Sequence, residues 1–180
     1  PLYSSAASDV YKRQEAVLGV AMPSRYTSAE SKEDAADLAR RLGIDLVEVP
    51  IEPAHAALSE LLSRALGAPA VGLTDENLQS RIRGVVLMGL SNQSGRVVLT
   101  TGNKSELAVG YSTLYGDTAG GYGVLKDVWK TEVFRLARWR NQWPVPQSSL
   151  VPMPERILTK PPSAELRPDP VSYTHLRAHE

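Results

Sequence analysis

The sequence LTTGNKSELAVGYSTLYGDTAGGYG, residues 99–123, joins an apolar run to a glycine-rich loop. It begins at the end of the apolar run RVVLT, turns through residues 101–103, and enters a helix at about Ser105. A strand that is followed at once by a turn and a helix is typical of a βαβ unit. Because ligands of open parallel sheets bind beyond the carboxyl ends of the strands, the stretch also predicts where a ligand site lies.

Strands and helices alternate along the rest of the chain. Apolar runs predict strands at 17–22, 45–51 and 96–100, and apolar stripes at helical spacing predict helices at 31–42, 54–66, 75–90, 105–110 and 130–141. The strands are almost entirely apolar, as are strands that helices cover on both faces. We therefore expect an α/β fold, a doubly wound parallel sheet.

The ends and faces of these helices can be predicted as well. The helix at 31–42 is expected to take Ser31 as its N-cap and to end at Gly43. In the helix at 75–90 we expect a buried stripe on Leu78, Ile82, Val85 and Gly89. After Trp143 the chain is rich in proline, and we expect irregular structure or a lid there rather than a further packing layer.

Composition excludes several classes of function. Twenty basic and twenty acidic residues cancel, so no nucleic-acid or membrane surface is indicated. The absence of cysteine excludes disulfides and thiolate catalysis in this chain and suits the cytoplasm. No apolar run approaches the roughly 20 residues of a membrane span. Two of the three histidines lie in the last ten residues, and His55 is expected on a helix surface, so we expect no histidine-based mechanism or metal site.

The two ends of the chain differ from its middle. Residues 1–14 and 171–180 have no sustained periodicity and do not continue the alternation of strands and helices. Both resemble translated sequencing-adapter read-through. We therefore expect them to be non-native flanks, and residues 15–170 to form the domain.

The turn after residue 100 carries the first candidate site. Lys104 and Glu106 place a cation and a carboxylate at the carboxyl end of a strand, beside the amides of a helix start. A carboxylate there can hold Mg²⁺, which prefers oxygen ligands. The alternative is a tight turn capped by Ser105, in which Glu106 only interacts with the helix dipole. The residues leave both interpretations open.

Two helices carry further candidates. Asn77 and Arg81 are four residues apart and share a helix face, as do Gln79 and Arg83. An amide beside a guanidinium suits a ribose, a phosphate or a carboxylate, although a solvated helix face has the same pattern. Lys130 stands at a helix start, where a cation opposes the helix dipole, and an anionic ligand would explain it. The residues alone thus indicate a nucleotide- or phosphate-binding α/β domain.

Three runs of the sequence resemble a known family. ENLQSRIRG, LTTGNKSELAVGYSTLYGDTAGGYGVLKDVWKTEVFRLARWRN and KPPSAELRPDP are similar to the synthetase domain of glutamine-dependent NAD⁺ synthetases. The resemblance covers residues 15–170 and implies a Rossmann-like, adenine-nucleotide α-hydrolase-like fold that is incomplete here. It also implies that ATP adenylates the nicotinate carboxylate of deamido-NAD⁺, releasing pyrophosphate, and that ammonia then displaces AMP to give NAD⁺. The cofactors implied are ATP and Mg²⁺.

The resemblance also implies roles for individual residues. Thr101 and Lys130 match residues that bind ATP, and Glu106 matches an acid near both the metal and the dinucleotide. Contacts with deamido-NAD⁺ are implied for Asn77, Arg81, Glu106, Tyr111, Ser112 and Asp117.

Parts of the family's pattern are missing from this sequence. The pyrophosphate-binding loop Ser-Gly-Gly-x-Asp-Ser is expected before VLGVAMPS and does not occur, and neither does a glutaminase domain whose cysteine would release ammonia from glutamine. We expect the parent protein to be a homo-oligomer and this chain alone to be almost inactive. Two alternatives stay open. One is another ATP pyrophosphatase, such as a relative acting in GMP or aspartate amination, and the other is a non-catalytic nucleotide-binding remnant.

Overall fold

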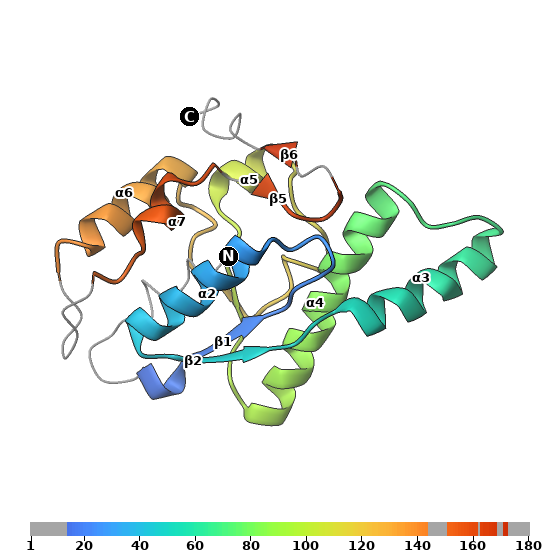
Figure 1. The fold of residues 1–180 in the computed structure, drawn as a ribbon, viewed down its shortest axis with the longest axis horizontal. Coiled ribbons are helices and arrows are strands. Elements are labelled where there is room, and N and C mark those ends of the chain that lie inside the picture. The colour runs from blue at the N-terminus through green and yellow to red at the C-terminus, as the bar shows by residue number, and fades with distance from the viewer. Residues whose placement is uncertain (1–13, 144–150, 162, 169–170, 173–180) are drawn as a thin grey trace.

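The fold is given by a computed structural model, which describes residues 14–143, 151–161, 163–168 and 171–172 (Figure 1). Its helices are the 3-10 helix η1 (Gln14–Ala16) and the α-helices α2 (Ala29–Leu42), α3 (Glu52–Leu66), α4 (Leu73–Ser94), α5 (Lys104–Ala108), α6 (Lys130–Arg140) and α7 (Glu155–Thr159). Its strands are β1 (Leu18–Ala21), β2 (Asp45–Glu48), β3 (Leu99–Thr100), β4 (Tyr122–Gly123), β5 (Ser163–Ala164) and β6 (Val171–Ser172). Every strand and helix predicted from the sequence is confirmed, with ends that differ by a few residues at most.

The strands of the central part pair in parallel. β1 pairs with β2 from Leu18 opposite Asp45 onward, and β3 pairs with β4 from Leu99 opposite Tyr122. Helix α2 lies between β1 and β2 in the chain, and α5 lies between β3 and β4, so each pair is a βαβ unit. The predicted α/β class with parallel strands is confirmed. In the described residues these strands form two separate short pairs rather than one continuous sheet, and β5 and β6 form a third, antiparallel pair.

Helix α2 shows how local sequence sets the ends of an element. Its N-cap is Ser28 and not Ser31, because the Ser28 Oγ accepts a hydrogen bond from the Ser31 backbone N–H at 3.2 Å. Ser31 lies within the first turn, whose amides need an acceptor from before the helix. The predicted end is confirmed: Gly43 has a φ of 64° and its N–H bonds to carbonyls of the last turn.

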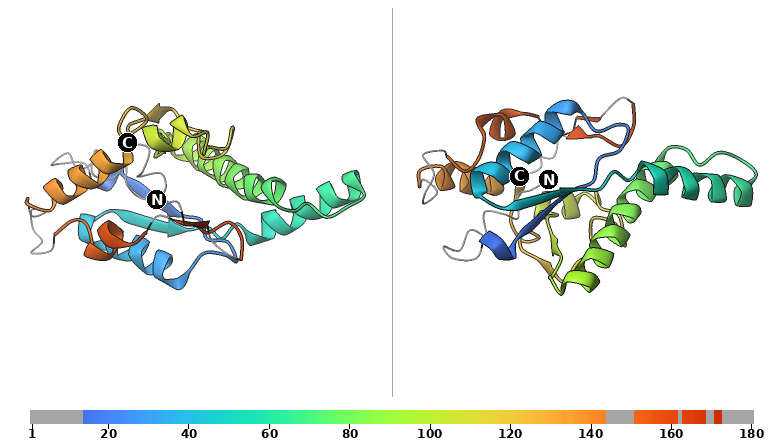
Figure 2. Two further views of the ribbon diagram at one scale, coloured as in Figure 1. Left: turned by 90° about the horizontal axis from the view of Figure 1, so that it is seen from above. Right: turned by 60° about the horizontal axis from the view of Figure 1, so that its bottom comes forward.

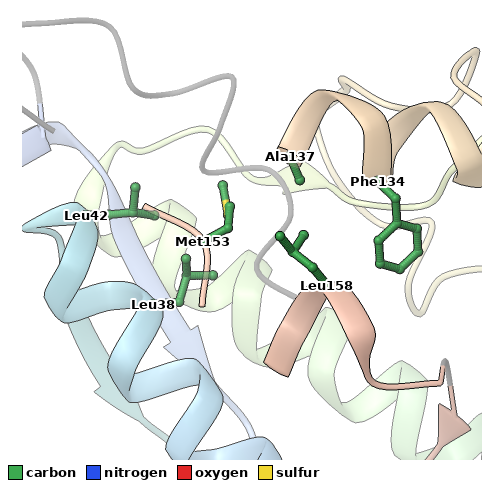
Figure 3. Close-up of a cluster of buried hydrophobic side chains, with 6 residues drawn as sticks. All are labelled: Leu38, Leu42, Phe134, Ala137, Met153 and Leu158. Carbon is green, nitrogen blue, oxygen red and sulfur yellow. The ribbon is translucent and has the colours of Figure 1, made fainter. Parts of the chain in front are cut away.

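The described core lies between α2, α6 and α7 (Figure 3). Its side chains are Leu38, Leu42, Phe134, Ala137, Met153 and Leu158. Met153 and Leu158 come from the proline-rich segment, and the Asn141 side chain holds the Met153 backbone with hydrogen bonds of 2.9 and 2.8 Å. The prediction that no packing layer follows Trp143 is therefore wrong. Prolines interrupt the periodicity that identifies elements, but they do not keep apolar side chains from packing.

Helices α3 and α4 leave much apolar surface uncovered. Figures 1 and 2 show α3 extending away from the rest of the chain, beside the start of α4. On α4, Ile82 is buried as predicted, but Val85 is 72% exposed. The buried side of α4 instead carries Gln79, Ser80, Ile82 and Gly84. The predicted stripe is partly wrong because α4 packs against a polar loop, described below. In the part of the chain that the structure describes, none of the helices combines the length and the hydrophobicity of a transmembrane span.

Candidate functional site

The end of β3 is built as a capped turn. The Asn103 Oδ1 accepts a hydrogen bond from the Glu106 N–H at 3.1 Å, and the Glu106 Oε2 accepts one from the Asn103 N–H at 3.0 Å. This reciprocal arrangement is a capping box, and it begins α5. The alternative that Ser105 caps the turn is wrong. The signal for the correct cap is the spacing Asn-x-x-Glu in GNKSE.

Helix α6 begins against the first turn of α5. The Lys130 backbone N–H donates to the Ser105 Oγ at 3.0 Å, and the Lys130 Nζ lies 3.0 Å from the Glu106 Oε1. The Lys130 and Glu106 side chains are 13% and 22% exposed, so this ion pair is largely withdrawn from water. The Lys130 cation at the start of α6 therefore has a carboxylate partner within the chain, which the sequence alone did not reveal. Two predicted site residues are brought together here.

The loop at 111–118, called the α4 loop below, lies on α4. The Thr113 Oγ1 donates to the Asn77 Oδ1 at 2.9 Å, and the Arg81 Nε donates to the Leu114 carbonyl at 3.2 Å. The Tyr111 N–H donates to the Glu106 carbonyl at 2.8 Å, which joins the same loop to α5. Asn77 and Arg81 therefore do not lie on a purely solvated face.

The other predicted site residues lie in or beside this loop. The Asp117 Oδ1 accepts hydrogen bonds from the Ser80 Oγ at 3.1 Å and the Thr113 N–H at 2.6 Å. Thr101 is half-buried directly after β3, and Ser112 is exposed. In the part of the chain that the structure describes, no hydrogen bond joins the side chain of Thr101 or Ser112 to the groups above.

His55 is buried rather than exposed, so the expectation of a helix-surface histidine is wrong. It is 4% exposed, and its Nε2 lies 2.8 Å from the Asp75 Oδ1 of α4. The Asp75 Oδ2 accepts from the Gln79 Nε2 at 3.2 Å, and the same nitrogen donates to the Leu166 carbonyl at 2.9 Å. Polar contacts thus hold α3 and the later segment to α4. His55 and Asp75 also line a hollow of about 470 Å³, together with Arg25, Tyr26 and Arg167.

Arg83 is a structural group and not a free surface arginine. Its Nε donates to the Met22 carbonyl at 3.0 Å, directly after β1, and burial lowers the pKa of its guanidinium from the ordinary value. Arg83 therefore ties the middle of α4 to the end of the first strand.

One family of proteins shares this sequence over nearly its whole length. The family model described as NAD synthase matches residues 5–178. The chain belongs to the NAD synthase family. Among its relatives, a glutamine-dependent NAD(+) synthetase from Rhodobacter capsulatus is 52% identical over 166 residues, which are 89% of this chain and 30% of the relative.

Solved structures of NAD synthase relatives share the fold. The glutamine-dependent NAD⁺ synthetase from Acinetobacter baumannii, in complex with ADP, has a TM-score of 0.78 and 46% identity, over 88% of this chain and 30% of that one. An NMN synthetase from Francisella tularensis has a TM-score of 0.74 and 27% identity, over 91% and 63%. The predicted family and fold class are confirmed, and this chain spans about 30% of the length of the two glutamine-dependent synthetases above.

One anchoring carboxylate, that of Glu165, is not predicted from the sequence. Glu165 accepts hydrogen bonds from the Ser28 N–H at 3.0 Å, the Ser28 Oγ at 2.7 Å and the Ser31 Oγ at 2.8 Å. Burial opposes ionisation, but the hydrogen bonds from Ser28 and Ser31 outweigh it, so the pKa of Glu165 lies below its ordinary value. Its partners are more than 130 residues away, so no local pattern predicts the contact.

Glu106 is the candidate ligand for Mg²⁺ at the end of β3. Glu106 supplies a carboxylate, and both of its oxygens already accept hydrogen bonds within the chain. No group of three or more His, Cys, Asp or Glu among the described residues could hold a metal ion. A Mg²⁺ at Glu106 would therefore take its other ligands from phosphate oxygens and water, which suits the usual behaviour of this ion.

Proposed function

We propose that the protein containing this chain is a glutamine-dependent NAD⁺ synthetase, which forms NAD⁺ from deamido-NAD⁺, ATP and ammonia and releases AMP and pyrophosphate. The observation that carries the proposal is the 52% identity with such a synthetase across 89% of this chain. The ADP in the related Acinetobacter baumannii structure supports a nucleotide site in the same fold.

The chemistry needs an activated carboxylate, because a free carboxylate is a poor electrophile. An oxygen of the nicotinate carboxylate attacks the α-phosphorus of ATP, and the bond from that phosphorus to pyrophosphate breaks. Ammonia then attacks the carbonyl carbon, the bond to AMP breaks, and a proton is lost to give the amide. Negative charge moves onto pyrophosphate in the first step, and fixed donors and cations stabilise that charge.

Lys130, Glu106 and Thr101 are proposed to form the ATP end of the site. The Lys130 ammonium has three donors, and one of them meets Glu106 at 3.0 Å, which orients the ammonium and leaves its other two donors for an incoming triphosphate. Thr101 follows β3 at its carboxyl end, where ligands of such folds bind. Bound Mg²⁺, held in part by Glu106, would offset charge on the phosphates.

The deamido-NAD⁺ end is proposed to lie on α4 and the α4 loop. Because the Asn77 Oδ1 accepts from Thr113 and the Arg81 Nε donates to Leu114, both side chains are held with nitrogen donors left to meet a ligand. Such donors suit carboxylate and phosphate oxygens. Glu106, Tyr111 and Ser112 are proposed as the remaining contacts, with Asp117 placed at the same end of the site, and Tyr111 joins the two ends through its bond to the Glu106 carbonyl.

The wider setting is proposed from the family alone. We propose that ammonia comes from a glutaminase domain of the same protein, that the protein is a homo-oligomer, and that it works in the cytoplasm.

A chimaera tests the function directly. Residues 15–170 replace the matching segment of the Acinetobacter baumannii synthetase, and AMP and pyrophosphate are measured with deamido-NAD⁺, with the mononucleotide substrate of an NMN synthetase, and with the acceptors of GMP and aspartate amination. We expect turnover with deamido-NAD⁺ above all others. A preference for another acceptor would contradict the proposal. If no AMP is formed with any of these acceptors, the result would favour a nucleotide-binding remnant.

A further inference from the structure

The α4 loop contacts a polar stripe of α4. The stripe consists of Asn77, Ser80, Arg81 and Gly84, which follow the spacing of one helix face. The loop residues that meet it are Thr113, Leu114, Tyr115, Gly116 and Asp117. Two members of the stripe are proposed ligand contacts, and the other two have only been described so far as buried.

Ser80 and Asp117 are joined in both directions. The Ser80 Oγ donates to the Asp117 Oδ1, and the Asp117 N–H donates to the Ser80 Oγ, each at 3.1 Å. The same Oδ1 accepts the Thr113 N–H at 2.6 Å. The buried Ser80 hydroxyl thus fixes the Asp117 carboxylate, which also binds the Thr113 N–H. The Thr113 side chain in turn donates to Asn77.

The α4 loop and α4 are closely packed at this contact. A Cβ at Gly116 would overlap the Ser80 Oγ, and a Cβ at Gly84 would lie 2.7 Å from the Tyr115 carbonyl oxygen. Between these contacts Tyr115 has a φ of 63°, a conformation that non-glycine residues rarely adopt. A strained conformation persists only where its surroundings hold it, and here the surroundings are the Ser80 face of α4.

We propose that Ser80 and Asp117 are a positioning pair, which fixes the α4 loop so that Asn77 and Arg81 present their nitrogen donors to an anionic group of the dinucleotide. The inference rests on the proposed function for its substrate. It differs from the earlier assignment of Asp117, because here the carboxylate acts through Ser80 and Thr113 and does not touch substrate. Ser80 then controls the affinity for deamido-NAD⁺ without contacting ATP.

The first test is steady-state kinetics in the chimaera. Ser80→Ala is expected to raise KM for deamido-NAD⁺ about tenfold, the effect of one lost hydrogen bond, while KM for ATP stays as it was. Ser91→Ala is the matched control, because the Ser91 Oγ also bonds from α4 to a following carbonyl, that of Arg96, at 2.6 Å. An unchanged KM for deamido-NAD⁺ in an active Ser80→Ala enzyme would overturn the inference and leave the proposed function intact.

The second test separates positioning from substrate contact. Asp117→Asn keeps the Oδ1 acceptor, so it is expected to raise KM for deamido-NAD⁺ less than Asp117→Ala does. Combining Ser80→Ala with Asp117→Ala is expected to add little to either alone, because both remove the same link. Equal damage from Asn and Ala would mean that the carboxylate charge meets the substrate, and the positioning role would be wrong.

Hydrogen exchange decides the matter if the chimaera makes no NAD⁺ or if Ser80→Ala is unstable. Backbone amides of residues 113–118 are expected to exchange about tenfold faster in Ser80→Ala, and also in Asp117→Ala, than in Ser91→Ala. Unchanged exchange in the variants that fold would overturn the inference. An inactive chimaera with the expected exchange would count against the proposed function alone.

Discussion

At the scale of single residues, the Glu106–Lys130 ion pair lies at the proposed ATP end of the site. Lys130→Met removes the cation 3.0 Å from a carboxylate that is 22% exposed. We expect a loss of about 1–3 kcal/mol in the free energy of unfolding, the usual cost of removing a partner from a charged hydrogen bond. Urea denaturation of the chain measures it, with the exposed Lys126→Met as control. The double variant with Glu106→Gln should lose less than the sum of the two, and simple additivity would mean that the pair contributes nothing.

A second residue, Glu165, gives the fold a pH dependence. Its pKa is lowered in the folded chain, so the ionised form stabilises the fold above the ordinary pKa of about 4.3, and this stabilisation is lost as the pH falls through the folded value. Glu165→Gln is expected to reduce the free energy of unfolding by about 1–3 kcal/mol at pH 7. The difference from the unaltered chain should narrow as the pH is lowered toward the folded pKa. Urea denaturation across this range tests it, with exposed Glu155→Gln as control, and an equal difference at every pH would contradict the prediction.

At the scale of elements, α7 is predicted to be part of the core. Leu158→Ala removes a side chain that is 2% exposed and should cost about 2–5 kcal/mol in the free energy of unfolding. Leu136→Ala is the matched control, since Leu136 on α6 is 49% exposed, and it should change the free energy by less than about 0.5 kcal/mol. Thermal and urea unfolding both measure the contrast. Similar small effects from the two variants would mean that α7 is not packed.

Replacement by alanine should change the free energy of unfolding in opposite directions at the two glycines of α4, the buried Gly84 and the exposed Gly89. Gly89 has nothing within 4 Å of an added Cβ, so Gly89→Ala should stabilise the helix by about 0.4–1 kcal/mol. At Gly84 the added atom meets the Tyr115 carbonyl oxygen at 2.7 Å, and the overpacking should cost about 1–3 kcal/mol. Unfolding free energies of the two variants give the comparison. A stabilising Gly84→Ala would show that the α4 loop moves away freely.

These elements also show what the sequence could predict. The helices and strands that the sequence predicts are those whose apolar spacing and breaks are local, and Gly43 at the end of α2 is an example. The short elements β4, β5, β6 and α7 are not among them. The face of α4 was partly mispredicted because the buried surface there is polar and is covered by a loop, so Ser80 and Gly84 carry no apolar signal. Glu106 and Lys130 were both expected at the site, but their contact spans 24 residues and needed the structure.

At the scale of the whole molecule, residues 1–14 and 171–180 are predicted to be flanks that the fold does not need. Within the residues that the structure describes, the core cluster includes none of them, and the described part of 171–180 is a two-residue pairing with β5. Deleting both ends should therefore shift Tm by less than about 4 °C, the shift expected from about 1 kcal/mol in a chain of this size.

Circular dichroism on heating compares that shortened chain with one that stops before residue 151. The second deletion also removes Met153 and Leu158, which are 1% and 2% exposed, and so should lower Tm far more or abolish the transition. Both deletions shorten the C-terminal end of the chain, but only the second removes core side chains. If trimming the two ends alone lowers Tm as much as removing the core residues does, then the ends stabilise the fold and are not foreign to it.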